Sequence, residues 1–278
     1  MIPPLVLVTG SSDGIGKETA GALAERGARV ILHGRDPERL AEAAREIDRR
    51  SGTWPVAQEI ADLASQADLR RFAARLLDHH PRLDVLINNA GVFMNSRQLT
   101  EDGLETTFAV NHLAAVLLTH LLLPALSESP QGRIINVSSG AHMSARLDWE
   151  NLHGERSFDG FAAYALSKLG NVLFAVELAR RLRGTPITVN ALHPGVVSTR
   201  LLRAGFGGHG TDSLQEAAAT SVHLALAPEL GTTTGAYFAR KVPSRMHPLA
   251  NEKQITARMY ELSCRLVGVA PLPLPHAA

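Results

Sequence analysis

Short aliphatic runs alternate along the chain with longer segments of helical periodicity, and no other feature constrains the fold as strongly. Strands are predicted at residues 5–8, 28–32, 55–59, 85–88, 133–137 and 188–193, with a weaker one at 236–239. Helices are predicted at residues 14–26, 37–50, 66–77, 104–126, 161–183 and 213–226, with a last one at 251–267. Most strand runs are apolar throughout, as strands buried on both faces are. This order predicts an α/β fold, a parallel sheet of about seven strands with helices on both faces and a ligand site beyond the carboxyl ends of the strands.

Length and composition predict a single domain over residues 1–278, because the chain contains neither a Ser/Gly linker nor an internal repeat. Its 28 Lys and Arg against 27 Asp and Glu give a net charge of +1, which lacks the basic excess that nucleic-acid partners require. The single cysteine, Cys264, permits no internal disulfide. The longest apolar run, 113–126, is broken by His120 and Pro124 and is shorter than the roughly 20 residues of a membrane span. No secretory leader precedes the first strand, so we expect a cytoplasmic protein without a membrane span.

A glycine-rich turn follows the first predicted strand and leads into the first predicted helix. Glycines at such positions permit a tight turn and let backbone N–H groups approach a pyrophosphate at the positive end of the helix. An ordinary tight turn is the alternative, but the placement between strand and helix favours a dinucleotide site. The spacing is TGxxxGxG rather than the commoner GxGxxG. The candidate binding residues in this turn are Gly10, Ser12, Asp13, Gly14, Ile15 and Gly16.

Tyr164 and Lys168 are four residues apart in a predicted helix, so their side chains share one face. A free tyrosine has a pKa near 10, which is too high for efficient proton transfer at neutral pH. A nearby lysine ammonium favours the phenolate and lowers that pKa. The pair could therefore exchange a proton with a substrate oxygen, and a surface pair without function is the alternative.

Several blocks of the sequence, in this order, resemble those of the short-chain dehydrogenase/reductase family. The blocks are the glycine turn, Asp62-Leu63, Asn88-Asn89-Ala90-Gly91, Asn111, Ser138-Ser139, Tyr164-Ala165-Leu166-Ser167-Lys168 and Pro194-Gly195-Val196-Val197-Ser198-Thr199. Residues 110–112, 151–155 and 263–266 look like the retinol-dehydrogenase-like branch, which includes the oxidoreductase portion of WW-domain oxidoreductases. The resemblance covers nearly the whole chain and implies one Rossmann-type, doubly wound domain. It further implies a substrate-loop insertion at about 140–163 and a C-terminal extension at about 240–278.

The resemblance implies an oxidoreductase that interconverts a carbonyl compound and an alcohol by hydride transfer. Tyr164 would act as the general acid and base, and Lys168 would also bind the nicotinamide ribose. Ser139 would steady the substrate oxygen. Asn111 would hold a water molecule that links Lys168 to solvent.

Further cofactor contacts are assigned by the same resemblance. Asp62 and Leu63 would contact the adenine, although Asp62 could instead cap the next helix. Close packing against the ribose and the sheet would involve Asn89, Ala90 and Gly91. The nicotinamide end would be held by Pro194, Gly195, Val197 and Thr199.

Selectivity between the two nicotinamide cofactors should be decided at the end of the second strand. Gly34 stands where members that use NAD carry an acidic residue, and Arg35 can offer a planar fork of donors to a phosphate. A solvated surface arginine is the alternative reading of Arg35. Asp36 more plausibly caps the helix after it than binds a ribose, and Asp13 stands where some relatives that use NADP carry a basic residue. NADP(H) is therefore favoured, and NAD(H) stays possible.

Other chemistries find less support in the sequence. The 12 histidines form no HxxxH or HExxH pair on a predicted helix, so no metal site is predicted. Ser139 lacks the GxSxG elbow of a hydrolase. A sensor or scaffold protein that binds the dinucleotide without catalysis is the alternative to an enzyme. We expect an apolar small-molecule substrate, and a homodimer or homotetramer through the helices predicted at 104–126 and 161–183, as in many relatives.

Overall fold

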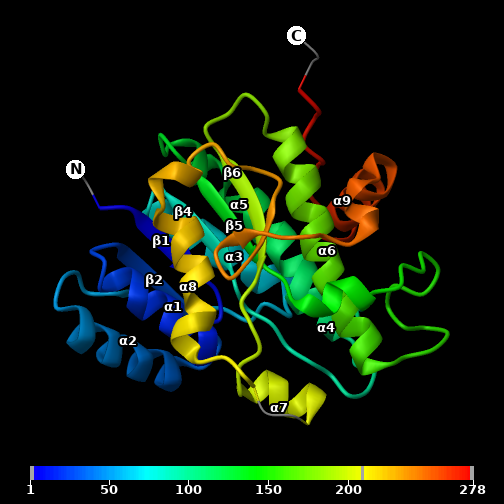
Figure 1. The fold of residues 1–278 in the computed structure, drawn as a ribbon, viewed down its shortest axis with the longest axis horizontal. Helices are drawn as coiled ribbons and strands as arrows, with labels where there is room; N and C mark the ends of the chain where they lie inside the picture. The colour runs from blue at the N-terminus through cyan, green and yellow to red at the C-terminus, as the bar shows by residue number, and fades with distance from the viewer. Residues whose placement is uncertain (1–2, 208–209, 276–278) are drawn as a thin grey trace.

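The computed structural model describes residues 3–207 and 210–275, and within them eight strands form one sheet (Figure 1). The strand order is β3-β2-β1-β4-β5-β6-β7-β8, and only the β7–β8 pair is antiparallel. The strands are β1 Leu5–Val8, β2 Arg29–Gly34, β3 Ala57–Ile60, β4 Val85–Asn88, β5 Arg133–Val137, β6 Thr188–His193, β7 Tyr237–Ala239 and β8 Val242–Pro243. The order reverses between β1 and β4, and a doubly wound sheet binds its ligand at such a reversal. The predicted fold class is confirmed.

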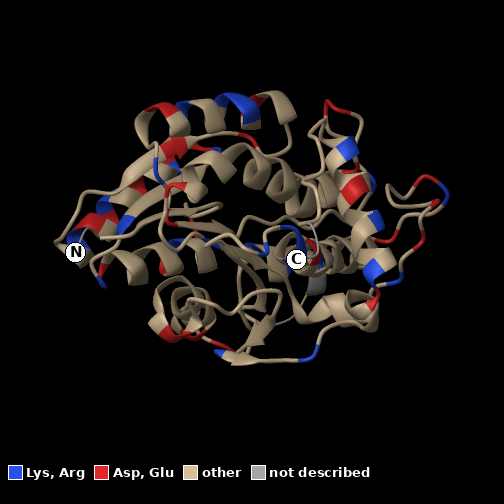
Figure 2. Ribbon diagram, turned by 90° about the horizontal axis from the view of Figure 1, so that it is seen from above, with Lys and Arg blue, Asp and Glu red and all other residues tan. Residues whose placement is uncertain are grey.

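Helices cover both faces of the sheet, as Figures 1 and 2 show. They are α1 Gly14–Ala24, α2 Pro37–Ser51, α3 Gln66–His79, α4 Thr106–Phe108, α5 Ala114–Ser127, α6 Gly160–Arg181, α7 Arg200–Phe206, α8 Leu214–Leu226 and α9 Lys253–Leu266. Side chains of one strand alternate between two cores because successive residues point to opposite faces. Val6 and Val8 of β1 join the core under α1, α2 and α8, whereas Leu5 and Leu7 join the core under α3, α5 and α6. Charged residues lie mainly on the outer helices and loops (Figure 2).

The structure differs from the predicted elements in three places. The helix predicted at 104–126 consists of α4, a π-helical turn at Ala109–Leu113, and α5. A π-helical turn inserts one residue into the helix, and this one is buried on all sides, so the apolar pattern did not reveal it. The strand β8 and the helix α7 were not predicted, because β8 has two exposed residues and α7 has only seven residues.

The C-terminal helix α9 packs against α6 and α5 within the same chain. The ring of Tyr260 stacks on Phe174 of α6 with 6.0 Å between centroids, and its hydroxyl bonds to His120 of α5 at 2.8 Å. The Pro-rich end docks here as well, because the N–H of Leu272 donates to the Tyr260 hydroxyl at 3.0 Å. The homo-oligomer through the helices at 104–126 and 161–183 stays a prediction.

Two helical stretches are long and apolar enough to cross a membrane by length and composition alone. They are Thr106–Ser127 and Gly160–Arg181, with mean hydropathy of 1.7 and 1.3. In each, 78% of the apolar window is buried inside the molecule, which is the pattern of a core helix. The absence of a membrane span stays a prediction.

Candidate functional site

The glycine turn joins the carboxyl end of β1 to α1 and packs closely against the end of β4. Gly10 and Gly14 have φ values of +65° and +56°, which favour glycine. A Cβ on Gly16 would lie 2.2 Å from the Gly10 oxygen and 2.4 Å from Nδ2 of Asn89. The glycine positions of the turn therefore leave a cradle at the first turn of α1, where N–H groups have no partner within their own helix. Such a cradle fits a pyrophosphate.

Residues absent from the sequence-based site hold this turn in place. The Oγ1 of Thr9 accepts the N–H groups of Asn89 and Ala90 at 2.9 and 3.1 Å, which ties β1 to β4. His33 of β2 is buried and its Nδ1 accepts the N–H of Gly10 at 3.2 Å. Burial lowers the pKa of His33 to about 4, so the ring stays neutral and keeps this acceptor. The sequence feature that could have indicated this role is a histidine inside an otherwise apolar strand next to the turn.

Asp13, the one acidic residue in the turn, is paired with two arginines. Its Oδ2 lies 2.9 Å from Nη2 of Arg39, at the start of α2, and 3.5 Å from Nε of Arg200 in α7. Its Oδ1 caps α1 by accepting the N–H of Gly14 at 2.7 Å. The carboxylate is half exposed, so these pairs are screened by solvent. The positive charges of Arg39 and Arg200 therefore largely offset the negative charge of Asp13.

The end of β2 presents Arg35 to solvent beside the turn. Arg35 is exposed, and a Cβ on Gly34 would lie 3.3 Å from Cβ of Ser12, which places β2 against the glycine turn. Asp36 caps α2 by accepting the N–H groups of Glu38 and Arg39, which confirms the capping interpretation of Asp36.

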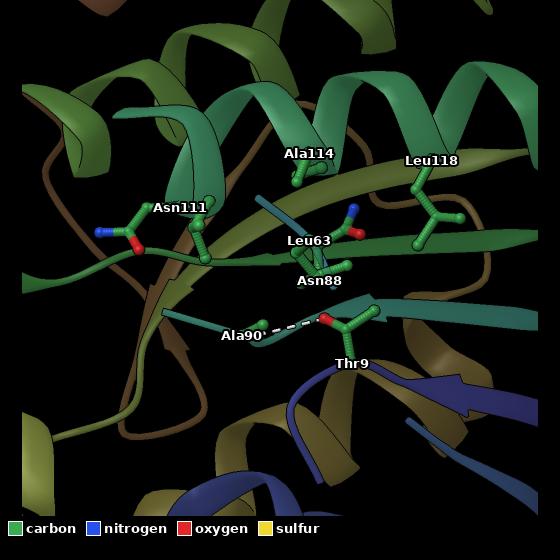
Figure 3. Close-up of a pocket in the computed structure, with 9 residues that line it drawn as sticks. Thr9, Leu63, Asn88, Ala90, Asn111, Ala114 and Leu118 are labelled. Carbon is green, nitrogen blue, oxygen red and sulfur yellow. Dashed lines mark hydrogen bonds between the residues drawn. The ribbon is translucent and has the colours of Figure 1, made fainter. Parts of the chain in front are cut away.

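A pocket lies between the carboxyl ends of β1 and β4 and the helix α5 (Figure 3). Its lining residues are Thr9, Leu63, Asn88, Ala90, Val110, Asn111, Ala114, Ala115 and Leu118. Three of them, Leu63, Ala90 and Asn111, belong to the predicted site.

Asp62 is exposed beside Leu63, and Ser65 rather than Asp62 caps α3. The alternative of Asp62 as the helix cap is therefore wrong.

Tyr164 and Lys168 lie on one face of α6, as the spacing predicts. Lys168 Nζ is 5.6 Å from the centroid of the Tyr164 ring and donates to the carbonyl of Val137, at the end of β5, at 3.0 Å. Both residues are buried. Burial lowers the pKa of Lys168 to about 8 and raises the pKa of Tyr164 to about 12. The expected lowering of the tyrosine pKa is thus not produced by the protein's own groups, because burial of the phenol outweighs its hydrogen bond with Ser139.

Asn111 lies in the π-helical turn, and its carboxamide is engaged at both ends. Oδ1 accepts the N–H of Val92 at 2.7 Å, and Nδ2 donates to the Val92 carbonyl and to the Ser167 hydroxyl, each at 3.0 Å. A Cβ on Gly91 would lie 3.4 Å from Lys168 Nζ and 3.5 Å from Asn111 Oδ1. The loop after β4, the π-helical turn and α6 therefore meet around Gly91.

Ser139 lies two residues beyond the end of β5, at the start of the 3-10 helix Gly140–Ser144, rather than closing the strand itself. Its hydroxyl accepts the N–H of Ala141 at 3.2 Å and is bonded to Tyr164. Ser138 faces away, as side-chain alternation predicts, and donates to the Lys168 carbonyl at 2.7 Å. The serine and tyrosine hydroxyls are thus adjacent, in position to bind one oxygen atom between them.

The segment from Pro194 to Thr199 leaves β6 and approaches the glycine turn. Gly195 has a φ of +109°, and the N–H of Val196 donates to Asp212 at 2.7 Å. Thr199 caps α7, and its methyl group would lie 3.5 Å from a Cβ on Gly14. Val197 is buried and Pro194 half-buried. The predicted nicotinamide residues therefore lie next to the predicted phosphate residues.

The carboxyl edge of the sheet thus brings together a cradle for a diphosphate, a buried ammonium and a pair of hydroxyl groups. No group of three or more His, Cys, Asp or Glu suited to a metal ion occurs within residues 3–207 and 210–275.

Replacing Lys168 tests whether burial of its ammonium group lowers the stability of the folded protein. We expect Lys168→Met to raise the free energy of unfolding at pH 7 by up to about 3 kcal/mol, because folding lowers the lysine pKa from 10.5 to about 8. Between these values the unfolded chain binds more protons than the folded one, so the wild type gains stability as the pH rises and the advantage of the variant shrinks. Urea unfolding at pH 7 and pH 9.5 measures the difference. A loss of stability at pH 7 would contradict this prediction, and Lys253→Met, on the exposed start of α9, is the control.

Comparisons with known proteins agree with this geometry. The family model for short chain dehydrogenase matches residues 4–206. Retinol dehydrogenase 13 of Homo sapiens is 42% identical over 292 residues, which cover 98% of this chain and 88% of that protein. The crystal structure of an uncharacterized protein from Mycobacterium paratuberculosis has a TM-score of 0.81 at 32% identity and covers 98% of this chain and 97% of its own. A short chain dehydrogenase from Shigella flexneri, complexed with NADP, has a TM-score of 0.69 at 28% identity, covering 86% and 97%.

The family model and the sequence relatives together match nearly the whole chain. The protein belongs to the short-chain dehydrogenase/reductase family and, within it, to the retinol-dehydrogenase-like branch of oxidoreductases that act on CH–OH donors.

Proposed function

We propose that the protein is an NADP(H)-dependent oxidoreductase that interconverts an apolar carbonyl compound and its alcohol, with Tyr164 as the general acid and base. The observation that supports this most strongly is the grouping of Tyr164, Ser139 and Lys168 at the carboxyl edge of the sheet, beside the glycine cradle. A nicotinamide dinucleotide would supply or accept the hydride there.

The protonation states in the site suit carbonyl reduction. A phenol with a pKa of about 12 is protonated at neutral pH and can donate its proton to the substrate oxygen as the carbon is reduced. Lys168, with a pKa of about 8, is mainly charged at pH 7 and stabilises the phenolate that remains. Ser139 binds the same oxygen and keeps it within reach of Tyr164. In the oxidation direction Tyr164 has to lose its proton first, so alcohol oxidation should speed up as the pH rises.

The substrate side of the site is apolar. The ring of Phe93 lies 5.7 Å from the ring of Tyr164, and Gly160 and Gly205 approach Phe93 so closely that a Cβ on either would meet it. The half-buried Leu201 of α7 lies near Gly91 on the same side. These contacts, together with the name of the retinol dehydrogenase relatives, support an apolar aldehyde, ketone or alcohol as the substrate.

Tyr164→Phe removes the proposed acid and keeps the ring. We expect kcat for reduction of an apolar aldehyde to fall at least about 100-fold, because general acid catalysis commonly contributes that much, with little change in KM for NADPH. Loss of NADPH absorbance measures the rate. Tyr260→Phe, a buried tyrosine on α9, is the matched control and should keep its kcat.

A sensor or scaffold protein that binds the dinucleotide without catalysis would give a different result in these assays. Dinucleotide binding without turnover in the wild type, unchanged by Tyr164→Phe, would contradict the enzymatic proposal.

The preference for NADP(H) rests on the charges near the end of β2. Gly34 offers no carboxylate to repel a 2′-phosphate, and the exposed Arg35 is a donor beside it. The acidic Asp13 would oppose a phosphate, but Arg39 is paired with it at 2.9 Å. The arginine at the start of α2 thus compensates for the missing basic residue in the turn. NADP in the related Shigella flexneri structure supports the same preference.

Arg35→Ala should raise KM for NADPH about tenfold, since a charged hydrogen bond to phosphate contributes roughly 1.5–3 kcal/mol. The KM for NADH should stay within about twofold, because NADH lacks the 2′-phosphate. Arg39→Ala should act in the same direction and leave Asp13 with only Arg200 nearby. Arg71→Ala, an exposed arginine on α3, is the control. Equal effects of Arg35→Ala on both cofactors would refute the role of Arg35.

A further inference from the structure

His142 is a buried histidine in the 3-10 helix after Ser139, and both of its ring nitrogens have backbone partners. Its exposed fraction is 1%. Nδ1 lies 2.7 Å from the carbonyl oxygen of Ser139, and Nε2 accepts the N–H of His247 at 3.3 Å. A carbonyl oxygen can only accept, so Nδ1 carries the proton and Nε2 is the acceptor. The two contacts therefore require one neutral tautomer.

Burial keeps His142 in this neutral form, since it lowers the pKa of the ring, and the nearby His193 and His247 act in the same direction. The ring also packs on Tyr237 of β7, with 4.6 Å between ring centroids. His142 thus joins its own loop to two segments much later in the sequence, with His247 lying 105 residues beyond it. The two segments are the strand β7 and the part of the C-terminal extension that carries His247.

The residue held by Nδ1 is Ser139, whose hydroxyl is bonded to Tyr164. Ser139 is outside β5, and the last backbone bond to β6 comes from the N–H of Ser138 to the Leu192 carbonyl at 2.8 Å. The Ser139 carbonyl also accepts the backbone N–H of His142 at 3.1 Å, so the imidazole is its second donor. On the other side of the same loop, the N–H of Gly140 donates to Nδ1 of His193 at 3.2 Å. The loop is therefore held between two imidazole rings, one through the carbonyl of Ser139 and one through the next N–H group.

We propose that His142 is a positioning residue for Ser139, and that through it the C-terminal extension sets the placement of the serine hydroxyl. The inference rests on the proposed function, because it assumes that Ser139 binds the substrate oxygen. Loss of the ring contacts lets the Ser139 backbone shift, and a shift of about 1 Å in a catalytic group can cost roughly 100-fold in rate. Both ring nitrogens of His142 are engaged by backbone partners, so in this proposal His142 acts only through Ser139.

The test is a double-mutant cycle in the full-length protein with NADPH and an apolar aldehyde. His142→Phe keeps the ring packing on Tyr237 and removes both hydrogen bonds. We expect kcat to fall roughly 10- to 100-fold with KM for NADPH within about twofold. In the Ser139→Ala background the same change should have almost no further effect, since the residue it positions is gone. His142→Asn, which restores a donor to the Ser139 carbonyl, should recover part of kcat.

Two controls separate positioning from folding. His120→Phe, at a half-buried histidine between α5 and α9, should lower the melting temperature and keep kcat. Circular dichroism must show folded protein for each variant, and His142→Asn carries the test if His142→Phe does not fold.

The outcomes distinguish the two proposals. A full additional loss from His142→Phe in the Ser139→Ala background overturns the positioning role while leaving the proposed function intact. No loss from Ser139→Ala or Tyr164→Phe alone overturns the proposed function itself.

Discussion

The site is organised around one buried charge, the ammonium of Lys168. A buried ammonium is costly to fold unless it is hydrogen-bonded, and here the carbonyl of Val137 at the end of β5 is its partner at 3.0 Å. This bond fixes α6 against the sheet and thereby places Tyr164 beside Ser139. Gly91, in the loop after β4, lies next to both Lys168 Nζ and Asn111 Oδ1. The same hydrogen bond that reduces the free-energy cost of burying the ammonium thus also holds the groups that the proposed chemistry needs.

At the glycine turn, the negative charge of Asp13 is balanced by arginine side chains at the surface. Asp13 would disfavour a second negative charge in the glycine turn, yet Arg39 and Arg200 lie against it. Arg200 belongs to α7, which follows the residues proposed to hold the nicotinamide. The phosphate end and the nicotinamide end are therefore connected through the same carboxylate.

Much of the fold and the chemical core of the site could be predicted from the sequence, because both depend on local patterns. Apolar runs define strands buried on both faces, and the spacing of Tyr164 and Lys168 defines a helix face. The π-helical turn at Asn111 could not be predicted, since apolar residues surround the inserted position. His142 and Arg39 were missed because their partners lie far away in the sequence, 105 residues for the bond between His142 and His247. The raised pKa of Tyr164 was missed because burial is a property of the folded chain.

The most direct test of the central claim follows the hydride itself. NADPH deuterated at C4 of the nicotinamide is incubated with the protein and an apolar aldehyde, and the alcohol is analysed by mass spectrometry. The proposed reaction places deuterium from one of the two C4 epimers on the carbinol carbon, and none from heavy water in a parallel reaction with unlabelled NADPH. An alcohol without label from either epimer, or no alcohol at all with a panel of apolar aldehydes and ketones, would contradict it.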